Sequence, residues 1–563
     1  MTALDDLADR YVDELAELDP CLAAVMGIAG QEERLTDFSP QAAQARTELA
    51  RRTLKAVDDT PVEGPAERIA ATVLRERLAT ELALADADAY GTLLDTLDGP
   101  VQRVRHAVGL LDQGAHTVWE TMLARLRAVP ATLAGLRESL AAARRGGRVA
   151  PYRQVVRNAR ECRDMRQYLA GLPAGLGEGA LRDAVEEAVA AANAALTDFA
   201  AYLSRELAPH APTVDALGRD RYQLGVREFC GTRLDLAETY AWGWDELARV
   251  QREMAEAAAR IAPGEPVPAV LAGLDGDPRH QVTGAEAFHH FLQELADGAI
   301  ADLDGRHFAI PGPLRRIDCR IAATDGPACY LAPSEDLSRP GTLWWPLTDT
   351  GAPIPTWTVP STMFHEGVPG HHLQLGVTTL GTETLNRFQR LSCELHPGHC
   401  EGWGLYAERL MDELGYFADP AHRLGLLAAQ QLRAARIVLD IGLHLRLPIP
   451  AGTAFHERER WTPRLGREFL TEHLGLGPPA FVTFEIDRYL GRPGQALAYK
   501  LGEKVWLEAR ETARLRHGAA FDLKQFHRHA LEMGPMGLDL LRTELAHWAP
   551  APAPEHAAIS AGD

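Results

Sequence analysis

Residues 361–377, STMFHEGVPGHHLQLGV, hold three histidines and a glutamate within eight positions: His365, Glu366, His371 and His372. Zinc in hydrolytic sites is commonly bound by two histidines and one carboxylate, and the fourth position is left to water. A glutamate beside the first histidine is the usual base of such sites. The segment therefore predicts a zinc site in which His365 is a ligand and Glu366 takes a proton from the attacking water.

The spacing departs from the familiar HExxH helix, because the fourth position after His365 is Pro369. A proline has no N–H for the carbonyl of His365, so the helix has to open there, helped by Gly370. On an unbroken helix His371 would point about 120° away from His365, and His372 would share its face but lie about 10.5 Å along the axis. We expect a break that returns His371 to the second ligand position, with His372 as the alternative.

A carboxylate ligand is expected from residues 399–415, HCEGWGLYAERLMDELG, where apolar residues recur at helical spacing. Two antiparallel helices, formed by residues 361–377 and 399–415, would face each other across the metal, and Glu401 is the predicted third ligand. His396 and His399 come just before it and stay open as competing ligands. The Pro-Gly pair between them indicates a loop, where histidines are commonly just solvated.

Both segments resemble signatures of the bacterial family known as domain of unknown function 885, HExxPGHHxQ and EGWxLYAE. More distantly, the first is similar to an HExGHALY-type helix of zincin peptidases, whose Gly-His aligns with Gly370-His371 and so favours His371 over His372. The resemblance implies a mainly α, elongated, zincin-like metallopeptidase fold that binds Zn²⁺. Further family-like stretches are residues 338–345, 435–444, 492–502 and 526–536.

Residues 492–502, RPGQALAYKLG, are expected to start a helix near Pro493 and to place Gln495 and Tyr499 on one face, one turn apart. A tyrosine hydroxyl aimed at the zinc would stabilise the oxyanion that forms when water attacks a carbonyl. From the residues alone, a half-buried tyrosine beside a solvated lysine is an equal reading, and the resemblance favours the catalytic role of Tyr499. Gln495 and Lys500 are candidates for substrate binding.

Three further polar residues are weaker candidates. Asp440 and His444 lie four apart in ARIVLDIGLH, a spacing that suits a pair that orients a metal ligand or joins the metal itself. An ordinary ion pair from Arg436 to Asp440 explains the same pattern. Arg339, in SRPGTLWW, has a planar guanidinium suited to binding a substrate carboxylate.

The composition of the 563-residue chain, with 46% hydrophobic residues and a formal net charge of −20, predicts a large core and argues against nucleic acid or anionic membranes as partners. The N-terminal residues lack the pattern of a secretory signal, so a cytoplasmic location is expected. The cysteines are scattered and never spaced as CxxC, and they are expected to be reduced core residues: Cys21, Cys162, Cys230, Cys319, Cys329, Cys393 and Cys400.

The chain divides by composition. Residues 1–304 are Ala/Leu/Arg/Glu-rich and predict stacked antiparallel helices, and residues 305–548 form the catalytic zinc region. Short β-branched runs broken by Pro and Gly near 305–360 predict a small β and loop insert, where an edge strand could hold an extended substrate. The tail, residues 549–563, is expected to be disordered. The alternative to this division is that the chain forms one continuous domain. Apolar helical spacing is clearest in residues 66–85, 115–145, 179–206 and 233–261.

The prediction from these patterns is a zinc-dependent hydrolase that cleaves peptide or peptide-like amide bonds. The alternative is a zinc-dependent biosynthetic enzyme that acts on a small amide-containing metabolite. A third hypothesis is a metal-bound scaffold without turnover, which the base Glu366 argues against, because a purely structural zinc needs no base.

Overall fold

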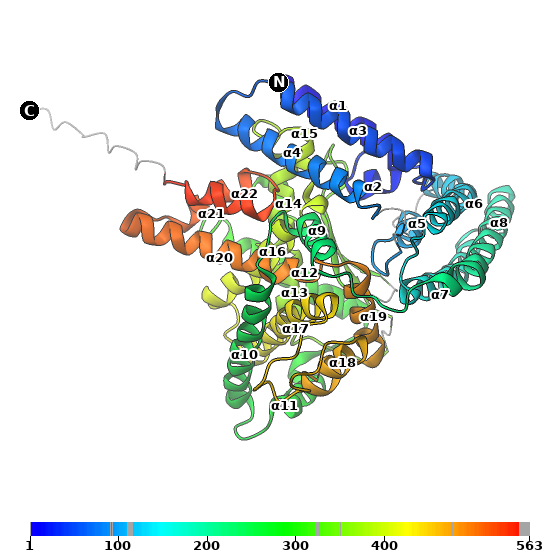
Figure 1. Ribbon diagram of the computed structural model, residues 1–563. Helices are drawn as coiled ribbons and strands as arrows, with labels where there is room; N and C mark the ends of the chain where they lie inside the picture. Colours follow the sequence, from blue (N-terminus) through cyan, green and yellow to red (C-terminus); the bar gives the residue numbers. More distant parts are fainter. Residues whose placement is uncertain are drawn as a thin grey trace, which may run out of the picture.

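The computed structural model describes residues 2–89, 92, 94–109, 116–322, 327–348, 351–475 and 477–550, which are mainly helical with two small sheets (Figure 1). The mainly α fold with a small β insert is therefore confirmed. Most of the predicted disordered tail, from residue 551 on, lies outside the described residues. Within them, no helix combines the length and the apolar character needed to cross a membrane.

The helices of the first half are α1 (Ala3–Leu18), α2 (Pro20–Val25), α3 (Pro40–Asp59), α4 (Gly64–Asp86), α5 (Pro100–Gly109), α6 (His116–Arg145), α7 (Tyr152–Gly171), α8 (Ala180–Tyr202), α9 (Arg219–Cys230), α10 (Leu236–Ile261), α11 (Val267–Asp275) and α12 (Ala285–Leu303). Those of the second half are α13 (Val359–Glu366), α14 (His371–Leu380), α15 (Arg387–Leu391), α16 (Pro397–Glu413), α17 (Pro420–Leu445), α18 (Pro463–Glu468), α19 (Pro479–Gly491), α20 (Ala498–His517), α21 (Leu523–Glu532) and α22 (Leu538–Ala546). The four stretches with the clearest helical spacing correspond to α4, α6, α8 and α10.

Helix starts follow from local side chains. At α1, Thr2 and Asp5 form a capping box, in which each side chain accepts a hydrogen bond from the backbone N–H of the other residue. At α17, Asp419 accepts from the N–H of Ala421 at 2.8 Å, and Pro420 fills the first helical position, where no N–H is needed. Local side chains thus set the first residues of α1 and α17.

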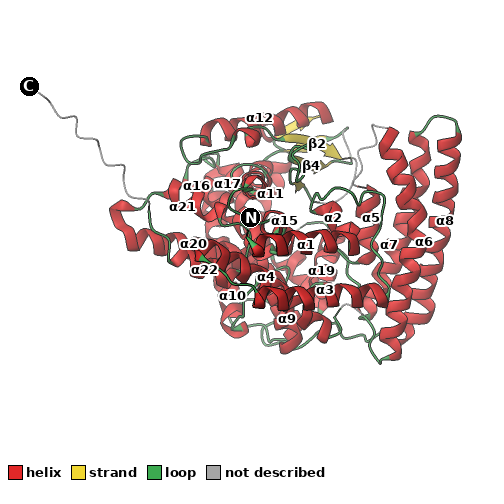
Figure 2. Cartoon of the chain, turned by 90° about the horizontal axis from the view of Figure 1, so that it is seen from above, coloured by secondary structure: helices red, strands yellow, loops and turns green. Residues whose placement is uncertain are grey.

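The buried side chains form more than one core. Helices α6 and α7 both pack against α8 at one side of the molecule (Figure 2), and with α5 they enclose a core of their own. The largest core runs from Leu4 near the N-terminus to Trp548 near the C-terminus, and it includes the contact of α10 with α17. The largest core thus contains residues on both sides of residue 304, and the division expected there stays a prediction.

The strands lie mainly where the sequence predicts the β insert. β2 (Asp318–Ala322), β3 (Cys329–Leu331), β4 (Thr342–Pro346) and β5 (Pro353–Pro355) fall within it, whereas β1 (Gln281–Thr283) precedes it. β4 pairs in parallel with β2 and antiparallel with β3, so β3 is an edge strand, and β1 pairs antiparallel with β5. The sheet packs beside α12 (Figure 2), and β5 leads directly into α13.

Candidate metal centre

The histidine-rich segment forms two short helices. α13 ends at Glu366 and α14 begins at His371, and the peptide bond before Pro369 is cis. Only glycine fits at position 370, because a Cβ on Gly370 would lie 1.9 Å from the carbonyl oxygen of His365. The predicted opening of the helix at the Pro-Gly pair is confirmed, and it is a complete interruption.

His365, His371 and Glu401 converge from α13, α14 and α16. The Oε2 atom of Glu401 lies 3.2 Å from Nε2 of His365 and 3.6 Å from Nε2 of His371. One ligand atom from each of the three residues lies within 4.8 Å of the others. Two nitrogens bound tetrahedrally to one zinc are about 3.3 Å apart, since each bond is about 2.0–2.1 Å. The three side chains therefore fit a zinc ion with little movement.

Two further features suit a metal ion. The Nδ1 atom of His371 is buried, and none of the described residues forms a hydrogen bond with it. Gly404 lets the ring of His365 lie flat against α16, because a Cβ at this position would be 2.5 Å from the Cε1 atom of that ring. A larger residue at position 404 would push His365 away from Glu401.

The sequence reasoning missed Glu408, which holds His365 from its other side. Oε1 of Glu408 lies 2.8 Å from Nδ1 of His365, and Oε2 accepts a hydrogen bond from the Ser361 hydroxyl at 2.5 Å. A carboxylate on Nδ1 leaves Nε2 free to bind a metal and fixes the ring orientation. The signal was present, because Glu408 follows Glu401 by two helical turns on the same face of α16.

Without a metal, the same carboxylates hold a proton on His365. Burial alone would lower the pKa of His365, but the hydrogen bonds with Glu401 and Glu408 outweigh it and raise the pKa to about 10. Burial opposes the charge of Glu401 as well, yet the two imidazoles hold its pKa well below the usual value. A metal ion at this position would replace the proton between His365 and Glu401.

Glu366 is placed to act as a base. It is half-buried at the end of α13, and none of the described residues forms a hydrogen bond or ion pair with its carboxylate. Burial raises its pKa above the ordinary value, while the charges of His365 and His371 oppose that rise. An unpaired carboxylate with a raised pKa beside the ligands is suited to accept a proton near neutral pH.

Tyr499 lies beside Glu401. Its hydroxyl accepts a hydrogen bond from Nη2 of Arg488 at 3.2 Å, and the guanidinium carbon of Arg436 lies 4.9 Å from the centre of its ring. Burial and the neighbouring charge of Glu401 raise the pKa of the Tyr499 hydroxyl. Tyr499 therefore keeps its proton and is available as a hydrogen-bond donor.

His372 is directed away from the candidate metal ligands His365, His371 and Glu401, called the ligand group below. Its Nδ1 lies 2.8 Å from the Tyr330 hydroxyl, and its Nε2 lies 3.0 Å from the carbonyl oxygen of Leu314. Both ring nitrogens are thus engaged within the fold, and burial lowers the pKa of the ring to about 4. His371, and not His372, is the histidine of α14 that the structure places beside His365.

Asp440 and His444 lie fully buried in α17 and contact other partners. Oδ2 of Asp440 accepts from the N–H of Gly494 at 3.0 Å, and Nε2 of His444 lies 2.9 Å from the carbonyl oxygen of Tyr489. The alternative explanation, an ion pair from Arg436 to Asp440, is wrong, because Arg436 pairs with Glu485 of α19 at 2.9 Å. Neither Asp440 nor His444 belongs to the ligand group.

The expected helix start near Pro493 is also wrong. The left-handed backbone of Gly494, with φ of +88°, delays α20 to residue 498, so Gln495 lies in a turn and accepts two hydrogen bonds from Arg488. Lys500 is buried in ion pairs with Glu503 and Glu246. Two of the three candidate substrate-binding residues, Gln495 and Lys500, thus contact internal partners.

Two other charged groups remain unpaired. In Arg339, Nη1 is buried and none of the described residues forms a hydrogen bond with it, which leaves the guanidinium available to a ligand. Glu394, which the sequence reasoning missed, has an exposed side chain, but the surrounding protein and the negative charge of Glu401 raise its pKa to about 6. Nothing in a short loop sequence distinguishes such a glutamate from a solvated one.

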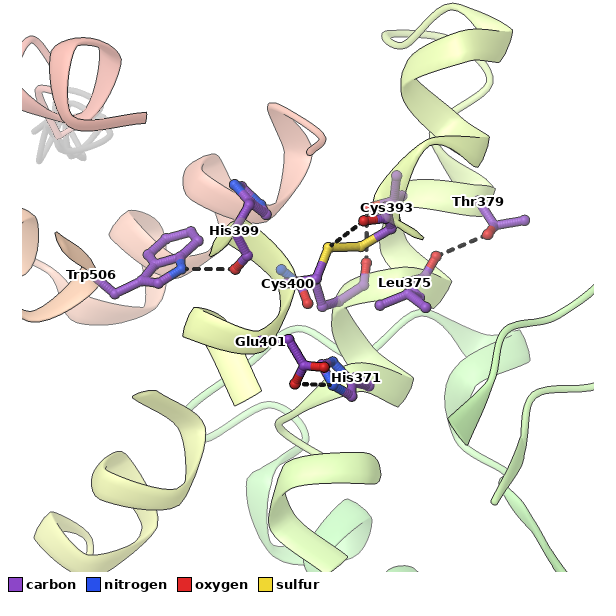
Figure 3. Close-up of a disulfide and its surroundings, with 10 residues drawn as sticks. His371, Leu375, Thr379, Cys393, His399, Cys400, Glu401 and Trp506 are labelled. Atoms are coloured by element: carbon purple, nitrogen blue, oxygen red, sulfur yellow. Dashed lines mark hydrogen bonds and ion pairs between the residues drawn. A yellow bond between two sulfur atoms is a disulfide. The ribbon is translucent and has the colours of Figure 1, made fainter. Parts of the chain in front are cut away.

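A disulfide lies close to the candidate ligands Glu401 and His371 (Figure 3). It joins Cys393 to Cys400, the residue before Glu401, so the expectation that both are reduced is wrong. The chain turns back between them and brings their Cα atoms within 6.3 Å, a proximity that the spacing of seven residues does not reveal. His399 packs against Trp506, with ring centroids 5.2 Å apart, and is not near the metal position.

Comparisons with known proteins identify relatives of the chain. A family model described as a bacterial protein of unknown function, DUF885, matches residues 20–545. The fold is similar to that of a candidate lipoprotein from Colwellia psychrerythraea, with a TM-score of 0.81 and 20% identity over 97% of this chain and 98% of that one. It is also similar to a candidate lipoprotein of unknown function from Shewanella oneidensis, with a TM-score of 0.71 and 16% identity over 97% and 100% of the two chains. A search of curated proteins gives no match.

Proposed function

The chain belongs to the bacterial DUF885 family, whose description assigns no activity, and we propose that it is a zinc-dependent hydrolase of peptide or peptide-like amide bonds. The observation that carries this proposal is the environment of the His365 imidazole. Glu408 contacts one ring nitrogen, and the other side of the ring faces Glu401 and His371. This is the arrangement of a histidine ligand with a carboxylate behind it. His365, His371 and Glu401 would hold the ion, in a zincin-like site.

A zinc ion bound there supplies a Lewis acid and lowers the pKa of a coordinated water. Glu366 accepts the proton of the attacking water, because its carboxylate lies beside the ligands and has no competing partner among the described residues. Tyr499 donates a hydrogen bond to the oxygen of the substrate carbonyl as it becomes negative. Arg488 holds the Tyr499 hydroxyl in place for this role.

An extended peptide is the substrate class that we favour. β3 is an edge strand, and the negative charge of Glu366 acts on its Cys329, so the strand lies close to the proposed base. An edge strand binds an extended chain through backbone hydrogen bonds. The unpaired guanidinium of Arg339, which follows β3 in the chain, suits a substrate carboxylate.

We propose that the protein works in a compartment other than the cytoplasm. The Cys393–Cys400 disulfide favours an oxidising compartment, because cytoplasmic thiols are normally kept reduced. The two solved structures compared above are described as candidate lipoproteins. The cytoplasmic location expected from the sequence therefore stays a prediction that the disulfide does not favour.

The test is Glu366→Gln, assayed against a library of short peptides and small amide-containing metabolites. The substitution keeps the shape of the side chain and removes the base, so turnover should fall at least about 100-fold at unchanged zinc content. Glu383→Gln, at an exposed position, is the matched control and should keep full activity. A retained rate in Glu366→Gln would rule out water activation by this residue, and a loss of zinc would make Glu366 a ligand.

The metal assignment has its own test. His365→Ala and Glu401→Ala each remove one of three ligands and should abolish zinc binding at this site. Full occupancy in both variants would exclude the site. Turnover of a metabolite without any peptide cleavage would favour the biosynthetic alternative over the peptidase.

A further inference from the structure

A second group of metal-binding side chains lies at the start of α17. His280 ends the short 3₁₀ helix Pro278–His280, just before β1, while Asp419 caps α17 and His422 lies in its first turn. One ligand atom from each of the three lies within 4.8 Å of the others. The group is separate from the first site, because Arg433, whose guanidinium lies 4.0 Å from Glu408, is eleven positions further along α17 than His422, or about 16 Å.

The distances within this group fit an ion between the side chains better than direct bonds. Nε2 of His280 is 3.8 Å from Oδ2 of Asp419, which is too long for a hydrogen bond. The rings of His280 and His422 stand edge to face, with centroids 5.5 Å apart. Two atoms that bind one zinc are separated by about 3.3 Å. The His280–Asp419 separation exceeds this value by about 0.5 Å, and no separation in the group exceeds 4.8 Å, so closing each gap by at most about 1.5 Å would bring all three onto a common ion.

Asp419 can cap the helix and bind a metal at the same time. Its Oδ1 accepts the hydrogen bond from Ala421 that starts α17, and its Oδ2 faces His280. His280 is buried, whereas the carboxylate of Asp419 is partly exposed to solvent. An ion here would have two imidazoles and one carboxylate from the protein and a remaining position open to water.

We propose that His280, Asp419 and His422 form a second binding site for a divalent transition metal ion of the zinc class. An ion there would join segments that are distant in the sequence. The carbonyl of His280 accepts from Thr356, just after β5, and β1 pairs with β5. A Cβ on Gly425 would lie 2.5 Å from the carbonyl oxygen of Trp357, so the first turns of α17 press on the same segment. The ion would fix the strand that leads into α13.

Zinc stoichiometry after equilibrium dialysis tests the proposal. The wild type should bind two zinc ions per chain, Glu401→Ala one, His422→Ala one, and the double variant none. Asp419→Asn is a second variant, which keeps an N-capping side chain and removes the charge, and should also bind one. His290→Ala is the matched control, because His290 pairs with a single carboxylate, Glu294, on the surface and should leave both zincs in place.

A further readout separates this site from the first. X-ray absorption of the zinc in Glu401→Ala should show nitrogen and oxygen ligands near 2.0–2.1 Å and no sulfur. Zinc should raise the melting temperature of Glu401→Ala, but not that of the double variant. Failure of the first site alone would leave one zinc in the wild type and none in His422→Ala. Failure of the second would leave one zinc in His422→Ala and none in Glu401→Ala, which would overturn the proposal.

Discussion

Zinc binding at the first site should release a proton from His365. In the metal-free protein, the Nε2 atom of His365 lies 3.2 Å from Glu401 and its Nδ1 atom 2.8 Å from Glu408, and the pKa of the ring is about 10. At pH 7 both ring nitrogens therefore carry a proton. A metal needs the lone pair of Nε2, so that proton has to leave.

The magnitude follows from this pKa. Below pH 10, the apparent affinity for zinc falls about tenfold for each unit by which the pH is lowered, for every proton displaced. Between pH 6 and pH 8 the apparent zinc affinity should thus rise about 100-fold, and at least one proton should be released per zinc. Because a second zinc would obscure the count, the measurement belongs in the His422→Ala protein.

Calorimetric titration with zinc, in buffers that differ in ionisation enthalpy, counts the released protons, and competition with a chelator gives the affinity at each pH. Glu408→Gln removes one of the groups that hold the proton, so the pKa of His365 should fall and fewer protons should be released at pH 8. Zinc binding without proton release, at an affinity independent of pH, would refute the charged state that we assign to His365.

Three further substitutions test other parts of the structure. Tyr499→Phe removes one oxyanion donor, so kcat should fall about 10²–10³-fold with unchanged circular dichroism. Burial raises the pKa of Asp440 to about 8 in the folded protein, against 3.8 for the ordinary group. Between about pH 4 and 8 the folded state therefore binds more protons than the unfolded state, so the free energy of unfolding falls as the pH rises, by up to about 1.4 kcal/mol per pH unit. Asp440→Asn should flatten that slope in urea unfolding at pH 5, 6 and 7, and an unchanged slope would contradict it. Cys400→Ser removes the disulfide with Cys393 and should lower the melting temperature, while the zinc of the first site stays bound; zinc loss would show that the disulfide positions Glu401.

Local patterns in the sequence predicted the helices and the opening at Pro369-Gly370. A proline removes a particular hydrogen bond, and its consequence is local, so no tertiary information was needed. The approach of Glu401 to His365 was predictable for a related reason, since two amphipathic helices with ligands near their ends have few ways to share an ion. The interruption itself is larger than expected, because the carbonyl of His365 leaves no room for a side chain at Gly370.

Partners chosen by tertiary packing could not be predicted. Arg436 had an acceptable partner one turn away in Asp440, but it pairs with Glu485, because α19 packs against α17. Lys500 looked solvated, yet it is buried with Glu503 and Glu246. In each case the competing partner is distant in the sequence, and a helical spacing rule considers only neighbours.

The contact between α10 and α17 has a consequence for synthesis in the cell. Gly243 of α10 approaches α17 so closely that a Cβ would lie 2.8 Å from the side chain of Ile437, and α17 is the main packing partner of α10. Pro420, the first residue of α17, is translated 159 residues after Ile261, the last residue of α10. At about 5–20 residues per second, the ribosome needs roughly 8–30 s to cover that distance. During this interval α10 has emerged without its partner, and a chaperone that shields apolar helices would have its main opportunity to bind the nascent chain.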